Sequence, residues 1–268
     1  MISFVGAGPG AADLITLRGA ARLAAADVVI WASSLVPEAL LQHCHSEVVV
    51  HDSAVMTLED VTTVYHHNPE TAAIVRLHSG DPSIYGAIQE QIDWCVIAGR
   101  SFEIVPGVTS IAAAAAALGR ELTIPRVGQS LVATRLAGRT AESMPPRESV
   151  AAFAAHGTTM AVFLSGARPD ELQRELLAST SAYSPDTAAV VVVRASWPDE
   201  QIIRTTVGEL ADAIRSTGAT MTLLVLIGDV LASRDTPRSH LYAPEFTTTY
   251  RLRSDSGSTV GRPSARRA

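Results

Sequence analysis

The sequence predicts an α/β protein made of two α/β domains. Short apolar runs alternate with helix-forming segments along most of its 268 residues, and this alternation is typical of βαβ units. Two of the apolar runs lead directly into glycine turns, at residues 6–10 and 79–81. Because open α/β sheets bind ligands at the carboxyl ends of their strands, two such turns indicate a small-molecule site.

The first 121 residues are expected to form the N-terminal domain. Apolar runs predict strands at residues 2–5, 28–31, 47–51, 71–77 and 102–105. The segments between and after these runs predict helices at about residues 14–26, 37–44, 58–66, 86–98 and 111–118. The last of these helices is rich in alanine, which indicates tight packing. Gly119 is placed as its C-cap and Pro125 blocks its continuation, so we expect a domain boundary there.

Residues 122–250 are expected to form the C-terminal domain. Apolar runs predict strands at residues 130–134, 160–164, 188–193, 202–206 and 222–227, with helices near residues 148–155, 169–179 and 207–216. The composition of residues 138–147, with two prolines and several small polar residues, predicts a mobile surface loop. Residues 251–268 lack apolar periodicity, which predicts a disordered tail.

The charge distribution argues against nucleic acid as a partner. The net charge is −6, and the last eighteen residues hold five arginines against one aspartate, so residues 1–250 carry −10. Phosphate binding needs a concentrated basic face, and the net negative charge of residues 1–250 argues against one. No apolar run approaches the roughly 18 residues that a membrane span needs, and residues 2–5 predict a strand rather than part of a signal peptide. We therefore expect a cytoplasmic protein that binds neither nucleic acid nor membrane.

Metal and hydrolase chemistry are not expected. Cys44 and Cys95 do not form a CxxC or Cys/His spacing, so they predict two reduced thiols in the core. The histidines show no metal-ligand spacing either. Ser165-Gly166 is not a nucleophile elbow, because that motif requires a glycine at the position of Phe163.

The first glycine turn satisfies the dinucleotide-binding fingerprint in its alanine form, through Gly6, Gly8 and Ala11. A nicotinamide-dependent oxidoreductase is therefore one candidate. Two features count against it. Pro9 removes a backbone donor from the turn, and the next strand ends without the acidic residue that would bind a ribose hydroxyl.

The second turn, Ser79-Gly80-Asp81-Pro82, exposes backbone groups and one carboxylate at a strand end. This pattern suits an adenosyl or amino-acid group better than a phosphate, because Asp81 would repel an anion. The alternative is that Asp81 caps the following helix. Thr109 and Ser110 likewise place two hydroxyl groups at a predicted helix N-terminus, where simple N-capping is the alternative.

Three motifs, in this order, resemble the tetrapyrrole (corrin/porphyrin) methylases that use S-adenosylmethionine. They are G-A-G-P-G at residues 6–10, S-G-D-P-x-x-Y-G at residues 79–86 and V-P-G-V-T-S at residues 105–110. The resemblance extends over about residues 2–251. Further segments at residues 34–37, 122–125, 134–140, 197–200 and 241–242 resemble the members that methylate a ring carbon of a cobalamin precursor.

The resemblance implies two α/β domains with S-adenosylmethionine in the cleft between them, a tetrapyrrole substrate above it, and a homodimer. Positions that hold the donor in relatives match Pro9, Ser79, Gly80, Asp81, Ile84, Thr109, Ser110, Leu164, Ser165 and Ala195 of this chain. Ser165 stands where uroporphyrinogen methylases carry a methionine, which argues against uroporphyrinogen as the substrate.

Methyl transfer from a sulfonium needs an in-line approach of a carbon nucleophile, so catalysis should come mainly from positioning and from excluding water. Asp81 and Tyr85 are candidate catalytic residues because they lie near the expected donor site. Arg135, Arg139 and Arg194 are candidates for binding the carboxylates of the macrocycle; a solvated surface charge is the alternative for each. A nicotinamide oxidoreductase and a non-catalytic tetrapyrrole carrier remain the competing classes.

Overall fold

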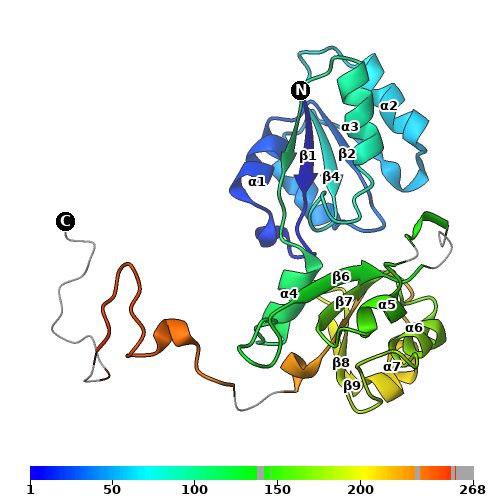
Figure 1. The fold of residues 1–268 in the computed structure, drawn as a ribbon. Coiled ribbons are helices and arrows are strands. Elements are labelled where there is room, and N and C mark those ends of the chain that lie inside the picture. Colours follow the sequence, from blue (N-terminus) through cyan, green and yellow to red (C-terminus); the bar gives the residue numbers. More distant parts are fainter. Residues whose placement is uncertain (138–141, 146, 233–235, 255–256, 258–268) are drawn as a thin grey trace.

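The protein is described here from a computed structural model, which covers residues 1–137, 142–145, 147–232, 236–254 and 257. The described residues form two five-stranded sheets with helices against them, so the α/β class is confirmed (Figure 1). Within these residues, no helix is long and apolar enough to cross a membrane. The same residues contain no group of three His, Cys, Asp or Glu side chains that could hold a metal ion.

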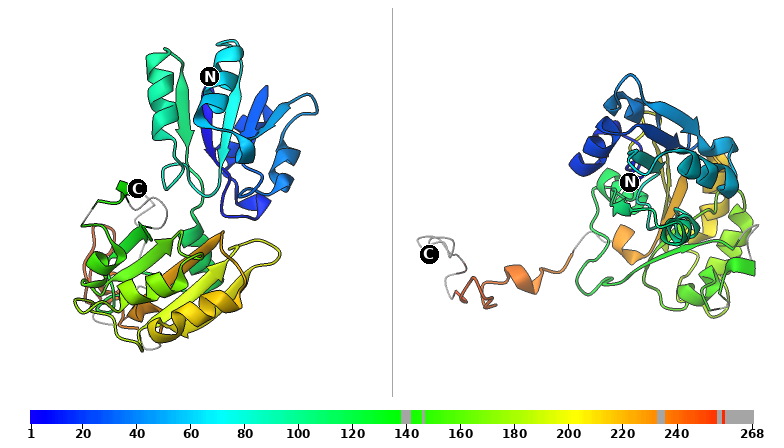
Figure 2. Two further views of the ribbon diagram at one scale, coloured as in Figure 1. Left: turned by 90° about the vertical axis from the view of Figure 1, so that its right-hand side faces the viewer. Right: turned by 90° about the horizontal axis from the view of Figure 1, so that it is seen from above.

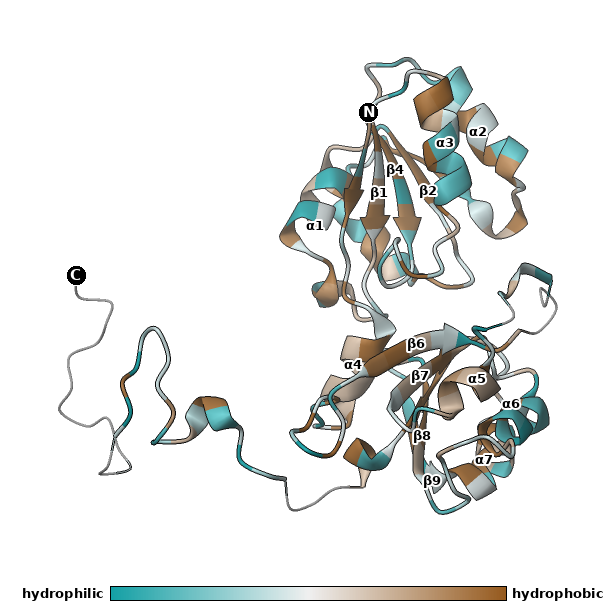
Figure 3. Cartoon of the chain, viewed as in Figure 1, coloured by the Kyte–Doolittle hydropathy of each residue, from teal (hydrophilic) through white to brown (hydrophobic). Residues whose placement is uncertain are grey.

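The first sheet is entirely parallel, with strand order β3-β2-β4-β1-β5. Its strands are β1 (Ile2–Gly6), β2 (Val28–Trp31), β3 (Val49–Asp52), β4 (Ile74–His78) and β5 (Phe102–Val105). Helix α1 (Leu17–Ala24) and the 3-10 helix Glu38–His43 pack on one face, and α2 (Leu58–His67) and α3 (Gln89–Ile97) pack on the other. Covering of both faces explains why the central strands β1 and β4 are buried almost throughout and are mostly apolar (Figure 3).

The second sheet is mixed, with strand order β6-β7-β10-β8-β9. Its strands are β6 (Leu131–Arg135), β7 (Thr159–Phe163), β8 (Ala188–Val193), β9 (Gln201–Thr206) and β10 (Leu223–Ile227). Only β6 and β7 run parallel, and the other neighbours are antiparallel. Strand β10, the last in the sequence, therefore lies in the centre, between β7 and β8.

Helices cover both faces of the second sheet as well. On one face pack α5 (Val150–Ala154), α6 (Pro169–Leu176) and α7 (Leu210–Ser216). On the other face packs α4 (Ser110–Ala117), through Ala113, Ala114 and the following Leu118. Alanine is suited to this position because it lets a helix approach a sheet closely. Although α4 follows the first sheet in the sequence, its packing partner is the second sheet.

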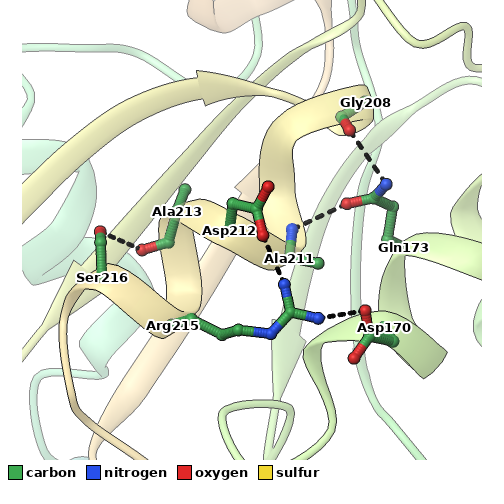
Figure 4. A network of polar contacts seen from close by, with 8 residues as sticks. All are labelled: Asp170, Gln173, Gly208, Ala211, Asp212, Ala213, Arg215 and Ser216. Atoms are coloured by element: carbon green, nitrogen blue, oxygen red, sulfur yellow. Dashed lines mark hydrogen bonds and ion pairs between the residues drawn. The ribbon is translucent and has the colours of Figure 1, made fainter.

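A polar network joins α6 to α7 at the surface (Figure 4). The side-chain amide of Gln173 donates to the Gly208 carbonyl at 2.9 Å and accepts the N–H of Ala211 at 2.7 Å. Nearby, the guanidinium of Arg215 pairs with Asp170 and Asp212. Gln173 thus pairs with the N–H of Ala211, which the first turn of α7 leaves unpaired, and with the carbonyl of Gly208 just before α7.

Several predicted helix boundaries differ from the structure. The segment near residues 37–44 is a 3-10 helix, which short segments often adopt. Helix α1 begins at Leu17, where Thr16 accepts the N–H of Gly19, rather than near residue 14. Helix α3 begins at Gln89 rather than near residue 86, because Tyr85 and Ala87 have left-handed backbone angles that no α-helix accommodates.

The segment of residues 236–254 extends away from both sheets in Figure 1 and in the right-hand view of Figure 2. It contains the 3-10 helix His240–Tyr242, and the Arg251 guanidinium donates to the carbonyls of Leu241 and Ala243. Of the predicted loop and tail, residues 138–141, 146, 255–256 and 258–268 lie outside the described residues.

Candidate functional site

The carboxyl ends of β1, β4 and β5 meet at glycine residues. A Cβ atom at Gly6 would lie 2.5 Å from the Cα of Gly107, and one at Gly107 would lie 2.1 Å from the carbonyl oxygen of Gly80. Gly8 and Gly80 also exchange two backbone hydrogen bonds, of 3.2 and 2.8 Å. Glycine is required at residues 6 and 107 because the backbones themselves are in contact, and it is favoured at residues 8 and 80 by φ values of 83° and 66°. The turns after three strands therefore form one continuous surface.

Asp81 fastens two of these turns together. Its Oδ1 accepts the N–H of Ser83 at 2.8 Å, and its Oδ2 accepts the N–H of Gly107 at 2.9 Å. Hydrogen bonds to a carboxylate are roughly twice as strong as neutral ones. The alternative that Asp81 caps the following helix is wrong, since α3 begins only at Gln89. The carboxylate instead holds the Ser79–Asp81 turn against the turn that leads into α4.

Thr109 does cap a helix. Its Oγ1 accepts the N–H of Ala112 at 3.3 Å at the start of α4. The N-capping alternative for Thr109 is therefore confirmed. Because α4 packs on the second sheet, this cap lies where the two halves of the chain meet.

The first glycine turn contacts the second half of the chain directly. The indole Nε1 of Trp197 donates to the carbonyl of Pro9 at 3.0 Å, and the N–H of Ala11 donates to Ser196 Oγ at 3.0 Å. A Cβ atom at Gly10 would lie 2.1 Å from the Trp197 ring. The loop after β8 thus fixes the position of the first turn.

A cavity of about 340 Å³ lies among these turns and the loops of the second sheet. All ten residues predicted to hold the donor line it, together with Tyr85: Pro9, Ser79, Gly80, Asp81, Ile84, Thr109, Ser110, Leu164, Ser165 and Ala195. Residues from positions as distant in sequence as 9 and 195 thus come together at one place. The roles assigned to them remain predictions.

One polar residue of the cavity wall is Ser165. This residue is fully buried, and its Oγ has no hydrogen-bond partner among the described residues. Leaving a buried hydroxyl unpaired costs roughly 1–3 kcal/mol. Ser79 and Ser110 also line the cavity, so it fits a ligand with polar groups as well as apolar ones.

The mouth of the cavity is apolar and open. Five of its side chains are between 40% and 67% exposed: Leu35, Ile84, Tyr85, Leu164 and Met221. The ring of Tyr85 lies 5.1 Å from the ring of Phe163, so the two halves meet at this edge too. Burial raises the pKa of the Tyr85 phenol, and the nearby Arg135 guanidinium opposes that change.

Three residues of the cavity wall hold backbone angles that side chains rarely adopt. Tyr85, Leu164 and Thr222 have φ values of 56°, 52° and 54°. Such conformations cost about 1–3 kcal/mol each and persist where the surrounding structure enforces them. They are common at ligand sites, which agrees with a functional role for this cavity.

The predicted substrate-binding arginines do not line the cavity where they are described. Arg194 pairs with Asp199, and its guanidinium carbon lies 4.9 Å from the centre of the Trp197 ring. Arg135 donates to Ser143 Oγ at 2.8 Å and to the carbonyl of Ala137 at 3.2 Å. Arg139 lies outside the described residues. The structure therefore brings Arg135 near Tyr85 but leaves the carboxylate-binding role of all three arginines a prediction.

Several cavity residues were not predicted. They are Leu35, Phe163, Gly166, Val192 and residues 220–224. Phe163, Val192, Leu223 and Leu224 carry only the sequence signal of ordinary apolar strands, and Leu35, Gly166 and residues 220–222 lie in loops. The position of β10 between β7 and β8 brings residues 220–224 to the cavity, and a sequence pattern does not reveal that pairing.

The local structure disfavours the dinucleotide alternative. A pyrophosphate is held at the N-terminus of the helix that directly follows the glycine turn. Here the turn leads into the 3-10 helix Ala12–Leu14, and α1 begins only at Leu17. The N–H of Ala11 is also taken by Ser196. The turn is therefore committed to packing against the second half of the chain.

Comparison with known proteins agrees with this architecture. Residues 1–211 match the family model for tetrapyrrole (corrin/porphyrin) methylases. A precorrin-4 C(11)-methyltransferase from a Sinorhizobium species is 41% identical over 95% of this chain and 99% of its own length. The X-ray structure of a cobalt precorrin-4 methyltransferase, a cobalamin biosynthetic enzyme, is 43% identical and covers 86% of this chain and 95% of that one, with a TM-score of 0.81.

A more distant relative shows what such a fold binds. The uroporphyrin-III C-methyltransferase of Thermus thermophilus, solved in complex with S-adenosylhomocysteine, is 26% identical. It covers 86% of this chain and 92% of its own, with a TM-score of 0.70. From the family model and the extent of these similarities, the chain belongs to the tetrapyrrole (corrin/porphyrin) methylases.

Proposed function

We propose that this protein transfers a methyl group from S-adenosylmethionine to carbon 11 of precorrin-4, or of its cobalt form, in cobalamin biosynthesis. Methylases of this family use S-adenosylmethionine, and relatives that match nearly the whole chain are named for C11 methylation. The observation that carries the proposal is the gathering of all ten predicted donor-binding residues around one cavity.

The residues of the cavity suit the chemistry of the donor. The hydroxyls of Ser79 and Ser110 offer hydrogen bonds to its polar groups. Ile84 and Leu164 offer apolar contacts. When bound, the donor supplies a methyl group that its sulfonium already makes electrophilic.

Methyl transfer then depends on what the chain does around the reacting atoms. A ring carbon of the tetrapyrrole attacks the methyl carbon as the bond from methyl to sulfur breaks, and one proton is later lost from the macrocycle. The glycine turns and Asp81 fix the walls that set the in-line approach. Tyr85 and Phe163, on opposite halves of the chain, exclude water from one edge.

The apolar mouth is the proposed seat of the macrocycle. Its five exposed side chains present a surface suited to the flat face of a tetrapyrrole. We place the carboxylates of the substrate near Arg135, Arg139 and Arg194. Each guanidinium–carboxylate pair would contribute ~1.5–3 kcal/mol to the binding free energy if it were shielded from water. Asp81 and Tyr85 are the proposed catalytic residues, Asp81 chiefly through the turns that it fastens.

We further propose that the protein is a cytoplasmic homodimer. Segment 236–254 exposes Leu241, Tyr242, Tyr250 and Leu252, each by more than half, and association with a second copy would cover apolar surface of this kind. Cys44 and Cys95 are both free thiols, which suits a reducing compartment. Light scattering on the purified protein measures the first property, and fractionation of the source cells measures the second.

The deciding experiment is a calorimetric titration with S-adenosylhomocysteine, with NADH in a parallel cell. We expect binding heat with S-adenosylhomocysteine and none with NADH. Binding of NADH alone would favour an oxidoreductase and refute the methylase. Incubation with precorrin-4 or cobalt-precorrin-4 and the donor should then add one methyl mass to the macrocycle, whereas a non-catalytic carrier would bind the macrocycle and leave its mass unchanged.

A further inference from the structure

The turn of residues 84–87 carries two side chains of the cavity wall in a strained conformation. Ile84 and Tyr85 line the cavity. Tyr85 and Ala87 have φ values of 56° and 49°, in the left-handed region. This region costs an ordinary residue about 1–2 kcal/mol. The turn therefore needs contacts that hold it in place.

One end of the turn is held from the strand side. Asp81 fixes Ser83, and the N–H of Ile84 bonds to the Asp81 carbonyl at 3.2 Å. A Cβ atom at Gly86 would lie 2.2 Å from the Pro82 carbonyl oxygen, so the middle of the turn folds back tightly on its start. These contacts leave the carbonyl of Ala87 at the far end to be held from elsewhere.

Gln91 holds that far end. Its side chain is almost fully buried, at 5% exposure, and its Nε2 donates to the Ala87 carbonyl at 3.1 Å. Its Oε1 accepts the hydroxyl of Tyr65 at 2.7 Å. Tyr65 is fully buried on α2, and its ring lies 5.5 Å from that of Trp94 on α3. The amide is therefore fixed in one orientation, with its N–H groups toward the turn.

We infer that Gln91, oriented by Tyr65, is a positioning residue that sets the Ile84–Tyr85 wall of the cavity for ligand binding. Neither side chain lines the cavity, so each acts only through the Ala87 carbonyl. The inference rests on the proposed function for the identity of the ligand, but the hydrogen bonds themselves do not depend on it.

The Gln91→Leu and Gln91→Glu variants test this inference. Leucine cannot donate to Ala87, so we expect the Kd for S-adenosylhomocysteine to rise about tenfold. A protonated glutamic acid both donates and accepts, whereas a glutamate only accepts. Burial of this position raises the pKa of an introduced carboxyl above its ordinary value, and the Arg76 guanidinium, which faces Tyr65, opposes that shift. Because burial is the larger effect at Tyr65, the Gln91→Glu variant should bind like the wild type at pH 5.5 and about tenfold more weakly at pH 8.5, and the wild type should show no such trend.

Ser3→Ala is the matched control. The Ser3 hydroxyl is buried on β1 of the first sheet and donates to Glu103 at 2.8 Å, away from the turn of residues 84–87. The Kd of the Ser3→Ala variant for S-adenosylhomocysteine should stay within twofold of the wild-type value. Unchanged affinity in folded Gln91→Leu would overturn the inference, as would a Gln91→Glu variant without pH dependence. If the Gln91→Leu variant does not fold, the pH dependence of ligand binding by the Gln91→Glu variant decides whether the inference holds.

Hydrogen exchange of the peptide spanning residues 83–92 separates this inference from the proposed function. We expect Gln91→Leu to speed exchange at residues 84–88 and Ser3→Ala to leave it unchanged. If the wild type binds no S-adenosylhomocysteine, the proposed function fails, and the exchange result alone decides the role of Gln91. Unchanged exchange in Gln91→Leu would refute that role.

Discussion

The substitution Gly107→Ala tests the convergence of the strand ends most directly. The added Cβ would lie 2.1 Å from the Gly80 carbonyl oxygen and 2.7 Å from the Cα of Gly6. An ordinary contact needs at least about 1.3 Å more than the shorter distance, and both neighbours are backbone. The turns must therefore separate, which would also stretch the 2.9 Å bond from the Gly107 N–H to Asp81 beyond hydrogen-bond range.

The expected cost is large. Overpacking contributes about 1–3 kcal/mol, and loss of a hydrogen bond to a carboxylate contributes about 1.5–3 kcal/mol. At about 2–4 °C per kcal/mol for a chain of this size, the Tm should fall by roughly 5–24 °C. Calorimetric melting measures the loss, and titration with S-adenosylhomocysteine should show strongly weakened binding.

Gly99→Ala provides the control for this prediction. Gly99 has a φ of 66°, and a Cβ there would meet nothing within 4 Å. Only the cost of left-handed backbone remains, about 1–2 kcal/mol, with ligand binding unchanged. If Gly107→Ala melted no lower than Gly99→Ala and bound ligand normally, the close backbone contact at the strand ends would be wrong.

Three further predictions concern single contacts. Asp81→Asn keeps one acceptor oxygen of two, so we expect S-adenosylhomocysteine binding about tenfold weaker by titration, equivalent to ~1.4 kcal/mol; unchanged affinity would contradict the fastening role. Trp197→Phe loses the bond to the Pro9 carbonyl, so the Tm should fall by about 2–4 °C with weaker ligand binding, and a wild-type melt would show that this contact is dispensable. Burial, together with the nearby positive charge of Arg76, lowers the pKa of His78 from 6.5 to about 3. Below pH 6.5 the imidazole is therefore protonated in the unfolded chain and stays neutral in the native chain. Stability is thus full above pH 6.5 and falls by ~1.4 kcal/mol per pH unit below it; melts of His78→Leu should lack this slope, those of the exposed control His66→Gln should keep it, and equal slopes in all three proteins would refute the assignment.

The strands of both sheets could be predicted because buried strands are continuous apolar runs, as Ala188–Val193 illustrates. The glycine turns could be predicted because close backbone contact leaves glycine as the only choice. The boundaries of the helices could not, since Tyr85 and Ala87 carry no sequence signal for the left-handed angles that delay α3.

The candidate site was only partly predictable. The turns at residues 79–81 and 106–110 follow strands and were found from the residues alone, whereas Leu164 and Ser165 came from the family resemblance. Val192 and residues 220–224 were missed because a strand from the end of the chain enters the middle of the second sheet. Pairing between strands distant in sequence is decided by tertiary packing, and no local pattern specifies it.

Helix α4 has a consequence for building chimaeras from related methylases. Its cap Thr109 belongs to the cavity wall, and its alanine face is buried in the second sheet. A crossover at residue 121 would graft one parent's helix onto the other parent's sheet and mismatch that interface. A crossover in the turn at Pro106, directly after β5, would keep each core with its own parent and exchange whole halves of the binding site.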